Sequence, residues 1–274
     1  MNPLILNQNT CKNASFDDLI ALAKDFDGLE LNFEKLSDLE SQGYSKKEIL
    51  ESLETYDLEV ASIFKLKNFT LCSERTFKKE VIPKLEKMLK WCYKLGCYLI
   101  LVEPSTLEGF ENPHRIPKWR IIRRSKQKLE KICKIADDWD VKIGFEFEYS
   151  KMSSIRTISQ SKKVLKPLAH IENLGYIIDV FEFAKSEGKI SQLSDIISLI
   201  YLVQLCDLKY TSPKELIKTS NKGRLPPGKG DYPIKKFIKF LRKRDYQRPF
   251  SFELYDYDCL RKLVNLRKKF RQYL

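Results

Sequence analysis

The sequence predicts an α/β protein of the (β/α)8 class, a TIM barrel formed by a single domain over residues 1–274. Short apolar runs of strand length alternate with amphipathic helical stretches along the chain, which implies a parallel sheet. About eight such units fit into a chain of this length, as in a closed barrel. No linker rich in Pro, Gly or Ser divides the chain, so we expect one domain.

An open, doubly wound sheet is the alternative fold. That fold usually carries a glycine-rich phosphate-binding turn directly after its first strand. The first strand is expected at Leu4–Asn7, and the segment that follows it, QNTCKNAS, contains no glycine. The closed barrel is therefore the preferred prediction.

In the first half of the chain, local signals mark where helices begin and end. Ser45 and Glu48 have the spacing of a capping box, which predicts a helix that ends near Tyr56. Gly96 is expected to end a long helix that begins near Thr76. The other expected elements are the strands Leu4–Asn7, Gly28–Asn32, Glu59–Phe64 and Tyr98–Val102 and the helix Phe16–Phe26.

The second half repeats the alternation. We expect the strands Val141–Phe147, Gly175–Asp179, Ile200–Cys206 and Pro249–Leu254. Helices are expected at about Trp119–Trp139, Ile158–Leu165, Pro233–Arg244 and Asp258–Tyr273, with a further helical stretch before the seventh strand. Proline suits the first turn of the helix that starts at Pro233, because that position needs no backbone N–H.

The formal charge of +13 raises the question of nucleic-acid binding. The basic runs KWRIIRRSKQK and RKLVNLRKKFRQ have the composition of solvated helix faces, and no nucleic-acid-binding motif accompanies them. We therefore disfavour a nucleic-acid partner. The positive field would instead attract a small anionic substrate, such as a phosphate or a carboxylate.

Cysteine usage and the N-terminus point to a cytoplasmic enzyme. The seven cysteines are odd in number, irregularly spaced and without a CxxC pair, so free thiols in a reducing compartment are expected. No apolar run reaches the roughly 18 residues of a membrane helix, and MNPLILNQNT lacks the features of a secretory signal. We expect no membrane partner, and a homodimer is compatible with the sequence.

Polar side chains stand near the carboxyl ends of the last four strands, where barrels carry out their chemistry. Glu146 and Glu148 lie on one face of the fifth strand, and Asp179 ends the sixth. Gln204 lies near the end of the seventh strand, and Glu253 lies in the eighth. Because side chains alternate along a strand, these oxygens are expected to face the interior near one rim.

Converging carboxylates repel one another unless a cation neutralises them. An all-oxygen set of three carboxylates and an amide favours Mn²⁺ or Mg²⁺, with Co²⁺ or Zn²⁺ as alternatives. Each residue taken alone also fits a salt bridge or a hydrogen bond at the rim. Four in phase on successive strands favour a metal site.

Several segments around these residues resemble the xylose isomerase-like TIM barrels, the sugar phosphate isomerase/epimerase superfamily. DVKIGFEFEYSKMSSIRTISQSKKVL is similar to the strand-five region of that family, and GYIIDVFEF is similar to its strand-six Asp motif. YLVQLCD and GRLPPGKGDYPIKKFIKFLRKRDYQRPFSFELY resemble its strand-seven and strand-eight signature, the most specific part. The resemblance covers nearly the whole chain.

Carried onto this sequence, the resemblance implies metal ligands at Glu146, Asp179, Gln204 and Glu253. It also implies that Arg224 contacts substrate oxygens, although a loop arginine paired with a rim carboxylate is the alternative. Gln204, where many relatives have histidine, is similar to the branch that contains dehydroshikimate dehydratase-like enzymes.

The sequence departs from the family pattern at Glu182 and Leu202, where many relatives have histidine. Glu182 could replace the substrate contact, bind a second cation or face solvent. Glu148 and His114 complete the expected substrate contacts, although His114 also fits a surface loop. His170 lies before the sixth strand, on the side away from the chemistry, and is expected to be structural.

The expected function is divalent-metal-dependent isomerisation or epimerisation of a keto-sugar, sugar phosphate or polyol ketone through an enediolate. Glu146 and Glu253, on opposite sides of the site, would move protons to and from carbon. The alternatives are a metal-dependent dehydratase acting on dehydroshikimate-type or ketoinositol-type substrates and a non-catalytic binding barrel. An endonuclease IV-like nuclease is disfavoured, because its histidine-rich three-zinc site cannot be built from two histidines.

Overall fold

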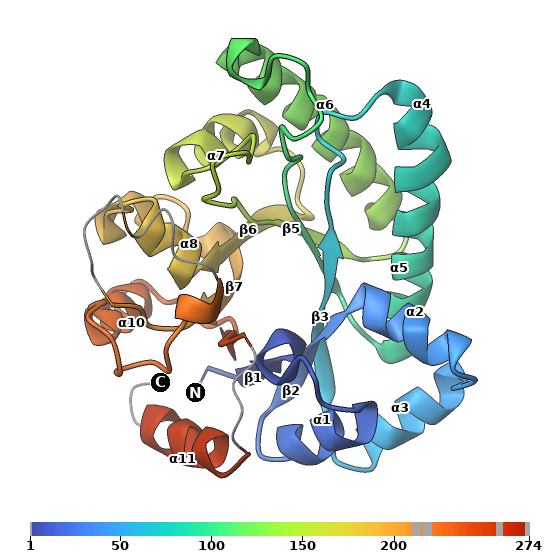
Figure 1. Cartoon of the computed structure of the whole chain (residues 1–274), viewed down its shortest axis with the longest axis vertical. Helices are drawn as coiled ribbons and strands as arrows, with labels where there is room; N and C mark the ends of the chain where they lie inside the picture. Colours follow the sequence, from blue (N-terminus) through green and yellow to red (C-terminus); the bar gives the residue numbers. More distant parts are fainter. Residues whose placement is uncertain (1, 210–214, 216–220, 256–259, 272–274) are drawn as a thin grey trace.

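Eight parallel strands close into a barrel in the order of the sequence (Figure 1). The computed structural model describes residues 2–209, 215, 221–255 and 260–271. The strands are β1 Leu4–Asn7, β2 Gly28–Asn32, β3 Glu59–Leu66, β4 Leu99–Val102, β5 Lys142–Phe145, β6 Leu174–Asp179, β7 Ile200–Leu205 and β8 Phe250–Phe252. Pairing of Leu4 with Phe250 joins the last strand to the first, so the predicted (β/α)8 fold is confirmed.

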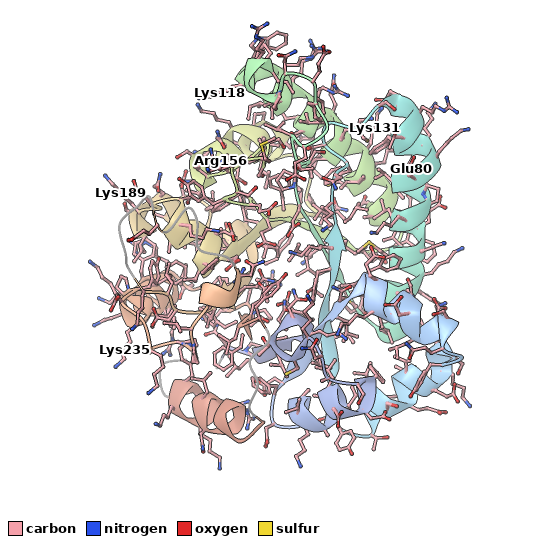
Figure 2. The ribbon with its side chains drawn as sticks, viewed as in Figure 1. Glu80, Lys118, Lys131, Arg156, Lys189 and Lys235 are labelled. Atoms are coloured by element: carbon pink, nitrogen blue, oxygen red, sulfur yellow. The ribbon has the colours of Figure 1, made fainter. Side chains whose placement is uncertain are left out.

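The helices form the outer layer around the barrel (Figure 1). They are α1 Phe16–Ala23, α2 Phe33–Ser41, α3 Lys46–Glu54, α4 Glu74–Thr76, α5 Ile82–Leu95, α6 Lys118–Asp137, α7 Ile158–Leu165, α8 Val180–Lys185, α10 Ile234–Arg242 and α11 Leu260–Arg271. A π-helical segment, Phe77–Val81, joins α4 to α5. Figure 2 shows Lys118, Lys131, Lys189 and Lys235 on this outer layer, and all four side chains are exposed.

Two of the predicted helix boundaries have the expected chemistry. The Ser45 hydroxyl accepts a hydrogen bond from the Glu48 backbone N–H, and the Glu48 carboxylate accepts one from the Ser45 N–H. Gly96 ends α5 in the left-handed conformation at φ 64°, which glycine adopts without steric cost. The prediction omitted α2, which Asn32 caps by accepting from the Glu34 and Lys35 N–H groups.

The lower part of the barrel interior is filled by an apolar layer. Its members, buried in one cluster, are Phe64, Leu99, Leu101, Ile177, Tyr201 and Leu202. Gly144 leaves room for this layer, because a Cβ atom there would lie 2.5 Å from Ile177 Cδ1. Gly144 therefore faces the interior, as the alternation along β5 predicts.

Most other buried apolar residues pack between the strands and the helices. Phe252 of β8, for example, contacts Phe270 of α11 edge to face at a centroid distance of 5.3 Å. The six cysteines that the structure describes are all free thiols, as predicted, whereas Cys259 lies outside the described residues. None of the helices in the described ranges is long and apolar enough to span a lipid bilayer.

Candidate active site

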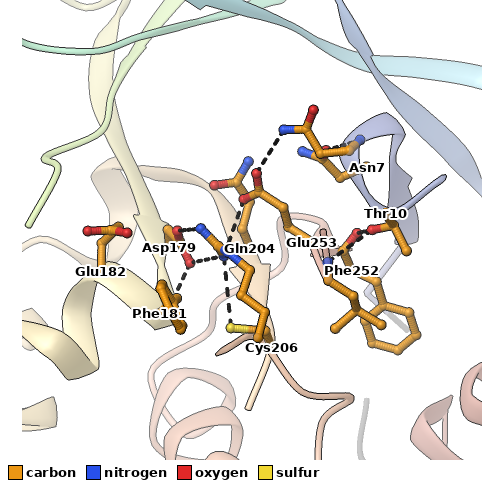
Figure 3. Close-up of polar contacts among 12 residues, drawn as sticks. Asn7, Thr10, Asp179, Phe181, Glu182, Gln204, Cys206, Phe252 and Glu253 are labelled. Atoms are coloured by element: carbon orange, nitrogen blue, oxygen red, sulfur yellow. Dashed lines mark hydrogen bonds and ion pairs between the residues drawn. The ribbon is translucent and has the colours of Figure 1, made fainter. Parts of the chain in front are cut away.

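Above the apolar layer, polar side chains gather at the mouth of the barrel (Figure 3). Most of them stand two residues after an inward-facing position of their strand, so the alternation lifts them one layer higher. We call this group, together with Arg224, the polar cluster. Its other members, each in or directly after one of the strands β1 to β8, are Asn7, Glu30, Lys65, Glu103, Glu146, Asp179, Gln204 and Glu253.

Arg224, in the loop between β7 and α10, forms a bidentate ion pair with Asp179. Its Nη1 donates to Asp179 Oδ1 at 3.0 Å and its Nη2 donates to Asp179 Oδ2 at 2.6 Å. Nη1 also lies 3.5 Å from Glu253 Oε2, and the guanidinium stacks over the Phe181 ring at 4.6 Å. Burial opposes its charge, but Asp179 and Glu253 outweigh burial and hold the pKa of Arg224 well above its usual range. The guanidinium is therefore a permanent cation inside the site.

A tightly packed turn places Arg224 there. The next residue, Leu225, forms an antiparallel bridge with Asp207, which follows β7. The Asp207 carboxylate accepts hydrogen bonds from the backbone N–H groups of Gly228 and Tyr232. Gly228 has φ 82°, and a Cβ atom on Gly230 would lie 2.4 Å from Asp207 Oδ1. The glycines of the PPGKG motif thus allow the loop to close over the end of β7.

Lys65 is the second cation of the polar cluster. Its ammonium forms an ion pair with Glu103, which follows β4. Burial opposes its charge, but Glu103, Glu146 and Glu253 hold the pKa of Lys65 well above its usual range. The site therefore has a fixed positive charge on the β3 side as well as on the β7 side.

Glu146 and Gln204 each present one buried oxygen without a partner among the described residues, namely Glu146 Oε2 and Gln204 Oε1. The Gln204 amide group donates to both carboxylate oxygens of Glu30 at 3.3 Å, which turns its own oxygen away from Glu30. Burial, reinforced by Glu103 and other carboxylates, raises the pKa of Glu146 well above its usual range. Such unpartnered buried acceptors are costly, so they mark a place for a bound group.

Glu253 lies between two donors. Its Oε1 accepts from Asn9 Nδ2 at 3.2 Å, from the short turn Gln8–Cys11 after β1, and its Oε2 faces Arg224. Burial raises the pKa of Glu253, and the charge of Arg224 partly offsets that rise. Glu253 is thus held on the Arg224 side of the polar cluster.

Glu182 is buried, so the expectation that it could face solvent is wrong. Its Oε2 accepts from the Tyr149 backbone N–H at 2.6 Å, and its Oε1 lies 3.7 Å from Lys185 Nζ. Burial, with the nearby charge of Asp179, raises the pKa of Glu182 to about 7. Glu148 is half-buried, and burial raises its pKa as well.

Neither histidine is among the described members of the polar cluster. His114 belongs to the short turn Pro113–Arg115 between β4 and α6, but its side chain is outside the described part of the chain, so its substrate contact stays a prediction. His170 is exposed in the loop before β6, at the amino-terminal end of that strand, where it was expected.

The polar cluster fits a divalent cation in charge and donor type, with one exception. Carboxylates outnumber cations among its described members: Glu30, Glu103, Glu146, Asp179 and Glu253 share it with Lys65 and Arg224. The free oxygens of Glu146 and Gln204 are hard donors of the kind that Mg²⁺ and Mn²⁺ prefer. Yet no three Asp, Glu, His or Cys side chains within the described ranges come together as a metal-binding group. The exception is Asp179, whose two oxygens are both held by Arg224.

The sequence analysis did not predict the members of the polar cluster that the first four strands contribute. Asn7 donates to Glu30 Oε1 at 2.9 Å, and Glu30 also accepts from the Ser62 hydroxyl at 2.8 Å. A charged residue inside the apolar run GLELN was the available signal for Glu30. Lys65 was harder to find, because the register of β3 shifts between Phe64 and Leu66 and breaks the alternation.

The chain is similar to known proteins in sequence and in fold. The family model of the xylose isomerase-like TIM barrel matches residues 19–272. An inosose isomerase of Halalkalibacterium halodurans is 24% identical over 178 residues, which are 65% of this chain and 60% of that protein. The match therefore spans less than two thirds of that relative's length.

Two solved structures show the same fold. The IolI protein with a bound zinc atom superposes with a TM-score of 0.88 at 20% identity, covering 99% of both chains. The probable 3-DHS dehydratase AsbF from Bacillus anthracis superposes with a TM-score of 0.76 at 17% identity, also covering 99% of both chains.

Proposed function

Because this chain belongs to the xylose isomerase-like TIM barrel family, we propose that it is an isomerase or epimerase of a keto-sugar, sugar phosphate or polyol ketone. The observation that carries the proposal is the pair of buried carboxyl groups, Glu146 and Glu253, at the mouth of the barrel beside two fixed cations. The inosose isomerase relative supports a cyclic polyol ketone as the first substrate to test.

The two carboxyl groups divide the proton transfers. Glu253, whose negative charge Arg224 supports, removes the proton from the carbon next to the carbonyl. Glu146, on the opposite side of the site, returns a proton to the other face or to the neighbouring carbon. Lys65 and Arg224 place positive charge where the enediolate oxygens become negative. Arg224 and Glu182, with Glu148 and His114, would orient the substrate.

We propose that Glu146, Gln204, Glu253 and Asp179 hold a divalent ion. When bound, the ion would polarise the carbonyl group of the substrate and stabilise the enediolate. The all-oxygen donor set favours Mn²⁺ or Mg²⁺. The zinc atom in the similar IolI structure keeps Zn²⁺ as a candidate, with Co²⁺ as a further alternative. The free thiols suit work in the reducing cytoplasm.

Proton exchange tests this proposal directly. The protein is incubated with an inosose or a keto-sugar in D₂O with Mn²⁺ or Mg²⁺, and NMR follows loss of the hydrogen next to the carbonyl. We expect exchange with the native chain and its loss in Glu146→Gln and Glu253→Gln. Glu86→Gln, on the exposed face of α5, is the matched control and should exchange normally. Absence of exchange with every ketone and metal would instead favour a binding barrel.

Dehydration is the second candidate, and Gln204 together with the likeness to AsbF favours it. Loss of a β-hydroxyl group from the same enediolate would give an unsaturated ketone. The same NMR experiment separates the two reactions, because dehydration creates a vinyl proton whereas epimerisation only exchanges a hydrogen for deuterium.

A further inference from the structure

We propose that Arg224 is an internal competitor for the metal site: it pairs with both oxygens of Asp179, and a divalent ion must displace it from Asp179 in order to bind fully. This inference rests on the proposed metal-dependent function. It concerns the free energy of metal binding, and its consequence is that the arriving metal ion releases the arginine expected to contact substrate.

The contacts of Asp179 carry the argument. The carboxylate is 1% exposed, and Arg224 engages both of its oxygens in a bidentate pair. Asp179 Oδ1 accepts in addition from the Phe181 backbone N–H at 2.8 Å. A metal ion would need one of these oxygens while carrying two further positive charges toward the guanidinium. Because like charges repel strongly in such a buried place, the two cations compete for one carboxylate.

Two of the other proposed ligands, Glu146 and Gln204, need no such exchange. Glu146 Oε2 and Gln204 Oε1 are buried and have no partner among the described residues. Glu253 accepts from Asn9 Nδ2 at 3.2 Å, and its contact with Arg224 is a longer one of 3.5 Å. Asp179 is therefore the proposed ligand of which both oxygens are already paired with a cation.

Arg224 has neighbours other than Asp179 on which its guanidinium can rest. Its Nε is buried without a partner among the described residues, so the present arrangement leaves one donor unused. The rings of Phe181 and Tyr255 lie 4.6 and 5.6 Å from the guanidinium. Stacking on an aromatic face tolerates rotation of the guanidinium within its plane, whereas the bidentate contact does not.

Mn²⁺ binding to the metal-free full-length protein tests the inference. Isothermal titration, with free Mn²⁺ followed by electron paramagnetic resonance, gives the dissociation constant without any substrate. We expect Arg224→Gln to bind Mn²⁺ about tenfold more tightly than the native chain, within the usual range of coupling between two sites. Arg224→Lys keeps the charge but loses the fork, so it should bind with intermediate affinity. Lys185→Gln removes a buried positive charge that contacts Glu182 and not Asp179, and should change the affinity little.

A double-variant cycle locates the competition at Asp179. In an Asp179→Asn background, the further change Arg224→Gln should no longer tighten Mn²⁺ binding, because the shared carboxylate is gone. Circular dichroism and thermal melting confirm that each variant is folded. Should Arg224→Gln not fold, Arg224→Lys still answers the question.

Three results would overturn the inference. Equal or weaker Mn²⁺ binding by both Arg224 variants would reject the competition and leave the proposed metal site standing. Equal tightening by Arg224→Gln and Lys185→Gln would show that net charge alone acts. No Mn²⁺ binding by any variant would reject the competition together with the metal part of the proposed function, which separates that failure from the first.

Discussion

The two halves of the barrel interior differ sharply, although the same strands build both. The apolar layer holds Leu99, Ile177 and Leu202 in a buried cluster. In β6 and β7, two residues farther along the strand, the polar cluster holds Asp179 and Gln204. A side-chain period of two thus stacks a functional layer directly on a structural one.

The difference teaches how one scaffold serves stability and chemistry separately. In the apolar layer the side chains are buried, and their burial stabilises the fold. In the polar cluster, unpartnered oxygens and crowded carboxylates are unfavourable for the folded state. Substitutions in the polar cluster are therefore expected to lower activity more than stability. Substitutions in the apolar layer are expected to lower stability more than activity.

Glu146→Gln gives the largest expected effect, in the polar cluster. Loss of a group that transfers a proton should slow hydrogen exchange in the substrate by about 10²–10⁴-fold. The free energy of unfolding should stay level or rise, because the variant removes a buried carboxyl whose Oε2 has no described partner. NMR measures the rate of hydrogen exchange, and urea unfolding measures the free energy of unfolding. A strong loss of stability would show that Glu146 is structural.

Ile177→Ala tests the opposite layer. Removing this fully buried side chain should lower the free energy of unfolding by about 2–5 kcal/mol through lost burial and a residual cavity. The exchange rate of the folded protein should change much less than in Glu146→Gln, because Asp179 is still presented by the same strand. Urea unfolding and exchange at a temperature well below the melting point give both numbers. Equal losses of activity in the two variants would break the comparison.

The distinction between the layers also explains what could be predicted from the sequence. The fold, the strands, and Glu146, Asp179, Gln204 and Glu253 follow from local alternation, which any strand of this period displays. Lys65 was not predicted to face the interior, because the register shift after Phe64 turns consecutive side chains inward. The Arg224–Asp179 pair was not predicted either, because the two residues are 45 positions apart in the sequence and their contact depends on how the β7–α10 loop folds back. Local pattern predicted the polar side chains of the last four strands, and only tertiary structure shows those of the first four strands and how all of them pair.

Glu182→Gln concerns the border of the polar cluster, and its effect is confined to the pH dependence of stability. Burial raises the pKa of Glu182 from 4.5 to about 7 in the folded protein. The folded state therefore binds this proton more tightly than the unfolded state, and the native chain should lose stability as pH rises from about 4.5 to 7. At about 1.4 kcal/mol per pKa unit, the loss should approach about 3 kcal/mol. The variant is neutral throughout and should lack this component. Urea unfolding of both proteins in EDTA at pH 5 and pH 8 measures the difference. Parallel pH profiles of the two proteins would show that the pKa of Glu182 is not raised by folding and that its carboxylate is charged at neutral pH.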